Sequence, residues 1–161
     1  MEPADLYRKY LDRALHFLSF RSRSEKEVRD NLLKKDASNE TIEQIISWLK
    51  DHNFLDDKDF ARRFIEQRIK LRPRGMRVIK MELKQKGISQ EIIEEITAEN
   101  EGEVDNELAM AKRIVEKKIM KYKGLEKREI YQKLGAHLAS KGFNWDIIKR
   151  SIDEYLSNEN F

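Results

Sequence analysis

The chain of 161 residues contains no cysteine, only two prolines and only six glycines. Without cysteine it forms no disulfide framework and no Cys-ligated zinc site, and it has no thiol nucleophile. The absence of cysteine also fits a reducing cytoplasm, where we expect the protein to act. Because proline and glycine weaken or interrupt helices, their scarcity favours helix throughout the chain.

Long apolar runs are absent as well. No run reaches the roughly 18 residues that a membrane-spanning helix needs, and residues 1–12 do not form the basic-then-apolar start of a secretory signal. We therefore expect no membrane partner. Apolar and charged residues each make up 39% of the chain, which is less apolar and more charged than an average globular domain. This balance favours an elongated helical body over one compact globule.

Motifs that carry catalysis or bind ligands are missing too. No glycine precedes a Lys-Ser or Lys-Thr pair, so there is no P-loop, and no Gly-x-Ser-x-Gly elbow is present. The three histidines are too far apart for helical spacing to pair them at a metal. We interpret the cluster of Asp56, Asp57 and Asp59 as a helix cap, because a cation loop needs more ligands. The sequence predicts no enzyme activity, no cofactor and no metal.

Apolar residues recur with helical spacing along nearly the whole chain. Between residues 42 and 49, isoleucine or leucine occupies positions i, i+3, i+4 and i+7. Ser24 followed by Glu27 forms a capping box, which marks the start of a helix. Further expected N-caps are Ser38, Asp56, Ser89 and Asn144, and the glycines expected to end helices are Gly87 and Gly142.

An internal repeat organises these helices. A shift of 51 residues places Leu32 on Leu83, and a further shift of 55 places Leu83 on Leu138 and Gly87 on Gly142. An accidental match between amphipathic helices is the alternative. We predict an all-α fold, an elongated tandem array of three three-helix repeats over residues 1–55, 56–102 and 103–161. The nine expected helices span residues 5–22, 24–36, 39–52, 57–71, 75–86, 89–99, 104–122, 126–141 and 144–158.

The small net charge of +3 conceals blocks of opposite sign. Residues 62–86 hold ten basic and two acidic residues, residues 87–107 eight acidic and none basic, and residues 108–141 ten basic and three acidic. Such blocks can be solvated helix faces, but guanidinium groups gathered at a turn around Pro73 suit phosphates or carboxylates. We predict a basic surface that binds a partner or phosphates, made of Lys70, Arg72, Arg74, Arg77, Lys80, Lys84, Lys112, Arg113, Lys117, Lys118, Lys121 and Lys123.

Two linked segments are similar to motifs of the RecX family, the bacterial regulators of the RecA recombinase. The first lies within residues 21–27, and the second is Leu55-Asp56-Asp57. The resemblance extends over residues 11–155 and is looser in the last third. The residues of the family-like motif are Arg21, Arg23, Ser24, Glu27, Leu55, Asp56, Asp57, Gly75 and Gly87.

The resemblance implies a non-enzymatic helical modulator that binds the RecA nucleoprotein filament. It also implies inhibition of recombinase, ATPase and coprotease activities, with a role in homologous recombination, DNA repair and the SOS response. The family has no catalytic residues to carry over. No coiled-coil seam is present, and we expect a monomer. The alternative is a helical module that contacts the phosphates of single- or double-stranded DNA.

Overall fold

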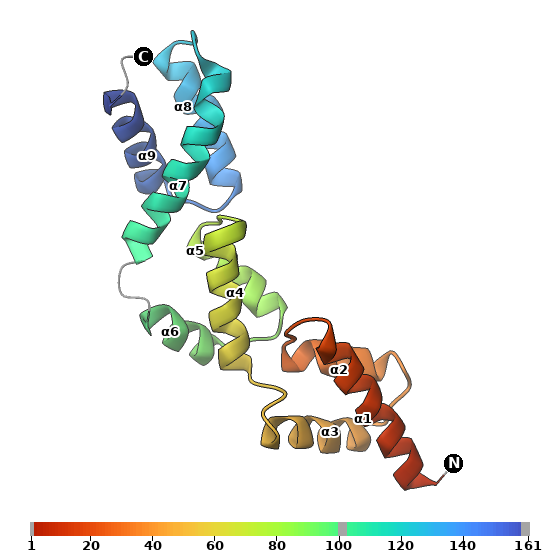
Figure 1. Cartoon of the computed structure of the whole chain (residues 1–161). Helices are drawn as coiled ribbons and strands as arrows, with labels where there is room; N and C mark the ends of the chain where they lie inside the picture. Colours follow the sequence, from red (N-terminus) through yellow and green to blue (C-terminus); the bar gives the residue numbers. More distant parts are fainter. Residues whose placement is uncertain (1, 100–102, 159–161) are drawn as a thin grey trace. The chain divides into compact units, whose positions relative to one another are not determined.

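The computed structural model describes residues 2–99 and 103–158, and for residues 103–105 the backbone alone (Figure 1). Within these ranges the secondary structure is helical with no strand, so the prediction of an all-α protein is confirmed. A short 3-10 turn, Met120–Tyr122, follows the seventh helix. The helices are α1 (Pro3–Ser19), α2 (Glu25–Leu33), α3 (Asn39–Asp51), α4 (Asp57–Leu71), α5 (Met76–Gln85), α6 (Gln90–Glu99), α7 (Glu103–Ile119), α8 (Lys127–Ser140) and α9 (Trp145–Asn158).

Side chains cap the helices where the sequence predicts. The capping box is complete, because Ser24 accepts from the amide of Glu27 and the Glu27 carboxylate accepts from the amide of Ser24. The other expected caps also accept an amide from the first turn of their helix. These pairs are Ser38 with Thr41, Asp56 with Lys58 and Asp59, Ser89 with Ile92, and Asn144 with Ile147.

Helix α1 ends three residues before the predicted position 22. Side chains satisfy two carbonyls of its last turns: Ser19 Oγ donates to His16 O at 2.7 Å, and Arg23 Nε donates to Phe17 O at 3.4 Å. Because side chains already donate to these two carbonyls, the helix can end at Ser19 without amides from a further helical turn.

Each second helix of a repeat ends in the same hydrogen-bonded turn. Gly87 and Gly142 adopt left-handed φ values of 80° and 90°, as expected for glycines that end helices. Asp36 takes the equivalent place in the first repeat with φ 63°, so the signal there is an aspartate rather than a glycine. The equivalent carbonyls of Leu32, Leu83 and Leu138 accept from the amides of Ala37, Ile88 and Phe143, respectively.

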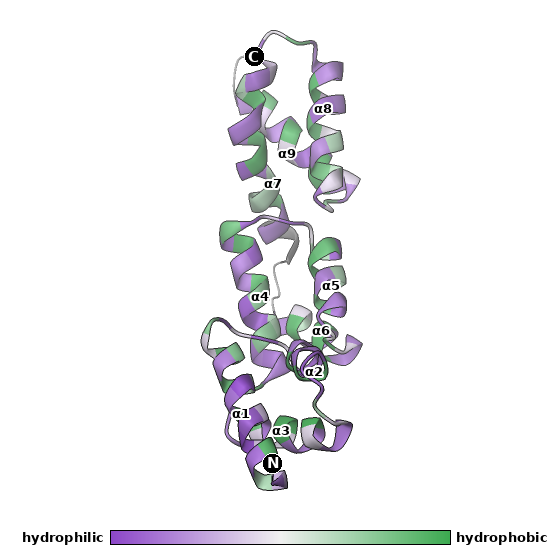
Figure 2. Cartoon of the chain, turned by 90° about the vertical axis from the view of Figure 1, so that its right-hand side faces the viewer, coloured by the Kyte–Doolittle hydropathy of each residue, from purple (hydrophilic) through white to green (hydrophobic). Residues whose placement is uncertain are grey.

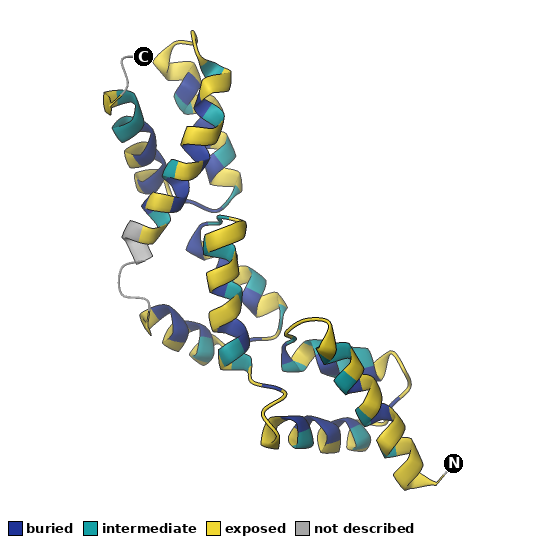
Figure 3. Ribbon diagram, viewed as in Figure 1, coloured by how far each residue is buried: buried dark blue, intermediate teal, exposed yellow. Residues whose placement is uncertain are grey.

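The contacts divide the chain into two compact units, Met1–Arg63 with Leu83–Ile96 and Phe64–Glu82 with Thr97–Phe161. Helices carry an apolar side and a polar side (Figure 2), and buried residues form bands along them (Figure 3). In the first unit, the core of α1–α3 includes Leu32, Ile45 and Leu49. In the second unit, the core of α7–α9 includes Met110 and Leu134. Among the described residues, no helix has the length and apolar composition to cross a membrane.

The division into compact units passes through α4, α5 and α6. It therefore does not test the predicted repeat boundaries at residues 55 and 102, which stay a prediction. What the structure adds is the set of contacts that join successive repeats.

Candidate partner-binding surface and the joints that support it

The first joint connects α2 with the loop after α5 and with the start of α4, all within the first compact unit. Ser24 Oγ donates to the carbonyl of Lys86 at 2.6 Å, and Lys86 Nζ pairs with Glu27 Oε1 at 2.8 Å. Asp57 Oδ1 accepts from the amide of Glu25 at 2.8 Å. The two segments of the family-like motif therefore contact each other and hold this joint.

The two carboxylates of the first joint have pKa values shifted in opposite directions. Burial alone would raise the pKa of Glu27, but hydrogen bonds from Arg21, Lys86 and the amide of Ser24 outweigh it and lower the pKa to about 2. Burial raises the pKa of Asp57, which the hydrogen bond from the Glu25 amide opposes. Arg21 donates to Glu27 at 2.7 Å. The capping box thus also belongs to an ion-pair network of Glu27 with Arg21 and Lys86.

Three other residues of the family-like motif also make contacts within the protein. The Arg23 guanidinium lies 3.9 Å from the centre of the Phe17 ring, a cation–π contact. Leu55 is buried, and Asp56 caps α4. These contacts give each of the three residues a structural role within the chain, so their presence in the motif does not require a binding partner.

The second joint connects the start of α5 with the loop after α8 and with α7, all within the second compact unit. The amide of Gly75 donates to the carbonyl of Lys141 at 2.9 Å. Glu107 Oε1 accepts from the amide of Met76 at 2.5 Å. Here too a carboxylate from the next repeat caps the first amide of a helix.

The two joints are built alike. Gly75 stands 51 residues after Ser24, and Lys141 stands 55 residues after Lys86, which are the shifts of the internal repeat. In both joints the carbonyl before a left-handed glycine accepts from the residue that precedes a helix. The same contact therefore recurs, with a serine hydroxyl as donor in one joint and a backbone amide in the other.

Close backbone approach explains why Gly75 is a glycine. A Cβ atom at position 75 would lie 2.0 Å from the carbonyl oxygen of Gly142. At Gly142 a Cβ atom would lie 2.2 Å from Val78 Cγ2. At these two positions of the second joint there is thus no room for a side chain larger than that of glycine.

The predicted basic residues are mostly exposed. Eleven of the twelve lie in the second compact unit, and Lys84 lies in the first. Within the part of the chain that the structure describes, Lys112 alone among them forms an ion pair, with Glu154. Those that are exposed are Lys70, Arg72, Arg77, Lys84, Arg113, Lys117, Lys121 and Lys123, and those of intermediate burial are Arg74, Lys80, Lys112 and Lys118.

The structure gathers two predicted residues with two unpredicted ones into what we call the cationic cluster: Arg74, Lys118, His137 and Lys141. Lys118 Nζ lies 3.4 Å from His137 Nδ1. Burial lowers the pKa of His137, and Lys118, Lys141 and Arg74 lower it further. Burial also lowers the pKa of Lys141, together with Arg74 and Lys118. A sequence signal existed, because His137 and Lys141 stand four residues apart around the end of α8.

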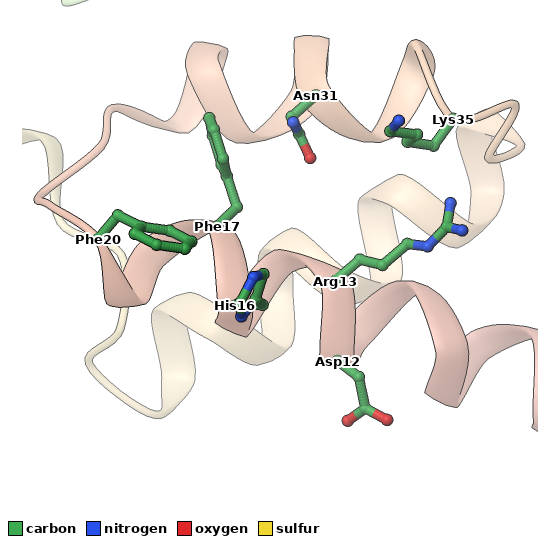
Figure 4. A pocket seen from close by; sticks show the side chains of 7 residues that line it. All are labelled: Asp12, Arg13, His16, Phe17, Phe20, Asn31 and Lys35. Carbon is green, nitrogen blue, oxygen red and sulfur yellow. The ribbon is translucent and has the colours of Figure 1, made fainter.

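A groove of about 450 Å³ lies in the first unit, between α1 and α2. Figure 4 shows Phe17, Phe20 and His16 along it, with Arg13 and Lys35 at one end. Phe20 is 70% exposed and packs edge-to-face on His16, with ring centres 4.9 Å apart. The ring of Phe20 therefore lies at the surface of the first unit. Within the described residues, no cluster of three or more His, Asp or Glu side chains could hold a metal ion.

Models of the first, second and third three-helix domains of RecX match residues 11–49, 56–96 and 105–152. The chain belongs to the RecX family. The predicted family and the tandem three-helix fold are therefore confirmed, whereas the roles predicted for the basic residues are not tested by this match.

Relatives in this family carry the name Regulatory protein RecX. The one from Prosthecochloris aestuarii is 36% identical over 151 residues, which are 94% of this chain and 96% of that protein. The one from Bacillus subtilis is 36% identical over 157 residues, 96% of this chain but 59% of that protein. The chain thus spans little more than half of the Bacillus relative.

Two solved structures have the same fold. The crystal structure of RecX from Lactobacillus salivarius matches with a TM-score of 0.83 and 30% identity, covering 94% of this chain and 97% of that one. A crystal structure of regulatory protein RecX matches with a TM-score of 0.81 and 26% identity, covering 93% and 74% of the two chains.

Proposed function

We propose that this chain is a non-enzymatic regulator that binds the RecA nucleoprotein filament in the cytoplasm. It inhibits the recombinase, ATPase and coprotease activities of that filament. The observation that carries the proposal is the match of three RecX domains in order along the chain. The relatives' name, regulatory protein, supports a regulatory rather than a catalytic role.

The contact surface in this proposal is the turn between α4 and α5. Arg72 is exposed in this turn and Arg74 is of intermediate burial, and Arg77 is exposed in the first turn of α5 that follows. Guanidinium groups bind carboxylates and phosphates through paired hydrogen bonds. Acidic protein side chains or the DNA of a filament can therefore serve as their partners.

The test follows ATP hydrolysis by RecA filaments formed on single-stranded DNA. Wild-type protein added in excess over filament sites should slow hydrolysis. The triple variant Arg72→Ala, Arg74→Ala and Arg77→Ala should inhibit less. A matched control with three exposed cations of the first unit replaced, Arg8→Ala, Lys9→Ala and Lys34→Ala, should inhibit like wild type.

Two results would count against the proposal at different levels. If wild-type protein has no effect at several-fold excess, the chain does not regulate RecA in this way. If the two triple variants inhibit equally, regulation stands but the turn between α4 and α5 is not its contact surface.

A second candidate is a DNA-binding module that acts through phosphate contacts. It is favoured by the number of exposed cations without an ion pair in the described part of the second unit. It predicts binding to bare DNA that weakens steeply as salt increases. The same arginine variant should then reduce the salt slope by about one per lost phosphate contact. An unchanged slope would exclude these arginines from DNA binding.

A further inference from the structure

The cationic cluster brings together side chains from three segments of the second unit. The hydrogen bond from Gly75 N to Lys141 O fixes the α4–α5 turn against the end of α8, which sets Arg74 beside Lys141. Lys118 comes from α7 and reaches His137 on α8. The joint that packs two repeats together therefore also assembles this group of cations.

The positive charges in the cluster are not neutralised. Among the described residues, no carboxylate forms an ion pair with Arg74, Lys118 or Lys141, although all three are of intermediate burial. Like charges that are partly removed from water repel each other. The lowered pKa values of His137 and Lys141 reflect this repulsion as well as burial. A bound anion would offset it.

The protonation of His137 follows from its neighbour. The ammonium of Lys118 can only donate, so a hydrogen bond between them makes Nδ1 the acceptor and puts the imidazole proton on Nε2. Nε2 is buried and finds no hydrogen-bond partner among the residues that the structure describes. Unpaired buried donors are uncommon in folded proteins. His137 therefore holds Lys118 in place as a neutral acceptor and adds no charge of its own.

We propose that Arg74, Lys118 and Lys141 bind a phosphate group, and that His137 is a positioning residue for Lys118. A phosphate offers several oxygens, with one negative charge in a phosphodiester and nearly two in a monoester or free phosphate. This suits one guanidinium and two ammonium groups that come from three segments. The phosphate can come from a free nucleotide or from a nucleic-acid backbone. This inference goes beyond the regulation of RecA, because it concerns phosphate binding by this protein in the absence of RecA.

The first experiment titrates the full-length protein with inorganic phosphate and follows the histidine ring signals by NMR. Chloride at equal ionic strength is the reference, and His16 and His52 are internal controls. We expect a saturable change at His137 alone, and a pKa of His137 that rises in phosphate because the anion offsets the neighbouring charges. Equal responses of all three histidines, or no response beyond that in chloride, would overturn the proposal.

Variants then test the individual ligands, with the backbone amide of Gly75 as reporter. Arg74→Gln or Lys141→Gln should weaken phosphate binding by about ten-fold or more, since each removes a charge-assisted hydrogen bond. The matched control Lys133→Gln, on the exposed side of α8, should leave binding unchanged. Unchanged binding in both cluster variants would show that the phosphate binds elsewhere.

The positioning role of His137 has its own test. His137→Asn keeps an acceptor for Lys118 and should retain most phosphate binding, whereas His137→Leu should weaken it. Equal loss in both variants, with the fold intact by circular dichroism, would contradict a role through Lys118.

A final set of probes separates the sources of the phosphate. A backbone phosphate predicts that oligothymidylate binds more tightly than thymidine monophosphate, through the same residues, and a nucleotide site predicts the reverse. A hexaglutamate peptide should not compete. If only that peptide perturbs His137, the cluster is a carboxylate site and the proposal is wrong. None of these assays contains RecA, so their failure is distinct from failure of the proposed regulation.

Discussion

At the scale of single residues, the carboxylate of Glu27 accepts hydrogen bonds from Arg21, from Lys86 and from the amide of Ser24. We predict that Glu27→Gln lowers the free energy of unfolding at pH 7 by about 1–3 kcal/mol. The range allows for solvent screening at Arg21, whose side chain is 47% exposed. Urea denaturation measures the change.

The pH dependence of this variant has a definite sign. The folded-state pKa of Glu27 lies near 2 and the ordinary value is 4.5, so the folded state binds fewer protons between these values. The stabilisation is complete above pH 4.5 and is lost as the pH falls toward 2. The difference between wild type and Glu27→Gln should shrink over this window. Asp30→Asn, which breaks an exposed pair with Lys26, is the control and should change stability by about 0.5 kcal/mol or less.

At the scale of elements, the close packing at Gly142 can be separated from its backbone conformation. Gly124 has almost the same φ, 87° against 90°, but a Cβ atom there would have no neighbour within 4 Å in the described part of the chain. We expect Gly124→Ala to cost about 1 kcal/mol from backbone strain. Gly142→Ala should cost about 1–3 kcal/mol more, because its Cβ atom meets Val78. Equal urea midpoints for the two variants would show that the second joint adapts without cost.

The register of the repeats can be tested by a substitution in the buried side of α5. Leu83 is 0% exposed and matches Leu32 and Leu138 in the other repeats. Leu83→Ala should destabilise the protein by about 2–5 kcal/mol through lost burial and a residual cavity. Met81→Ala on the same helix, where the side chain is 47% exposed, should change stability little. A near-neutral Leu83→Ala would contradict the assigned role of this position in the core.

At the scale of the whole molecule, each compact unit contains one tryptophan, Trp48 in the first and Trp145 in the second. Ser24→Ala removes a helix cap and leaves the carbonyl of Lys86 without its partner, at a cost of about 1–3 kcal/mol to the first unit. In backgrounds with a single tryptophan, we expect the urea midpoint reported by Trp48 to fall more than that reported by Trp145. Equal shifts would mean that the two units unfold as one cooperative body.

The sequence by itself determined the helices and their caps. Helical periodicity and capping depend on residues within a few positions of one another, as with Ser24 and Glu27, so they can be read directly from the chain. The end of α1 was predicted too late because Arg23 bonds a carbonyl of that helix from outside it. Helix α2 was predicted to end at residue 36 and ends at Leu33. The left-handed conformation of Asp36 was not predicted, because glycine is the usual signal.

The tertiary structure alone decided how distant residues meet. The capping box of Ser24 was predicted, but its contacts with Lys86 and with the segment that contains Asp57 were not. The basic residues were predicted as one surface, yet only packing could set Arg74 and Lys118 beside His137 and Lys141. The physical reason is that a helix forms through local hydrogen bonds, whereas the placement of side chains far apart in sequence depends on the joints between repeats.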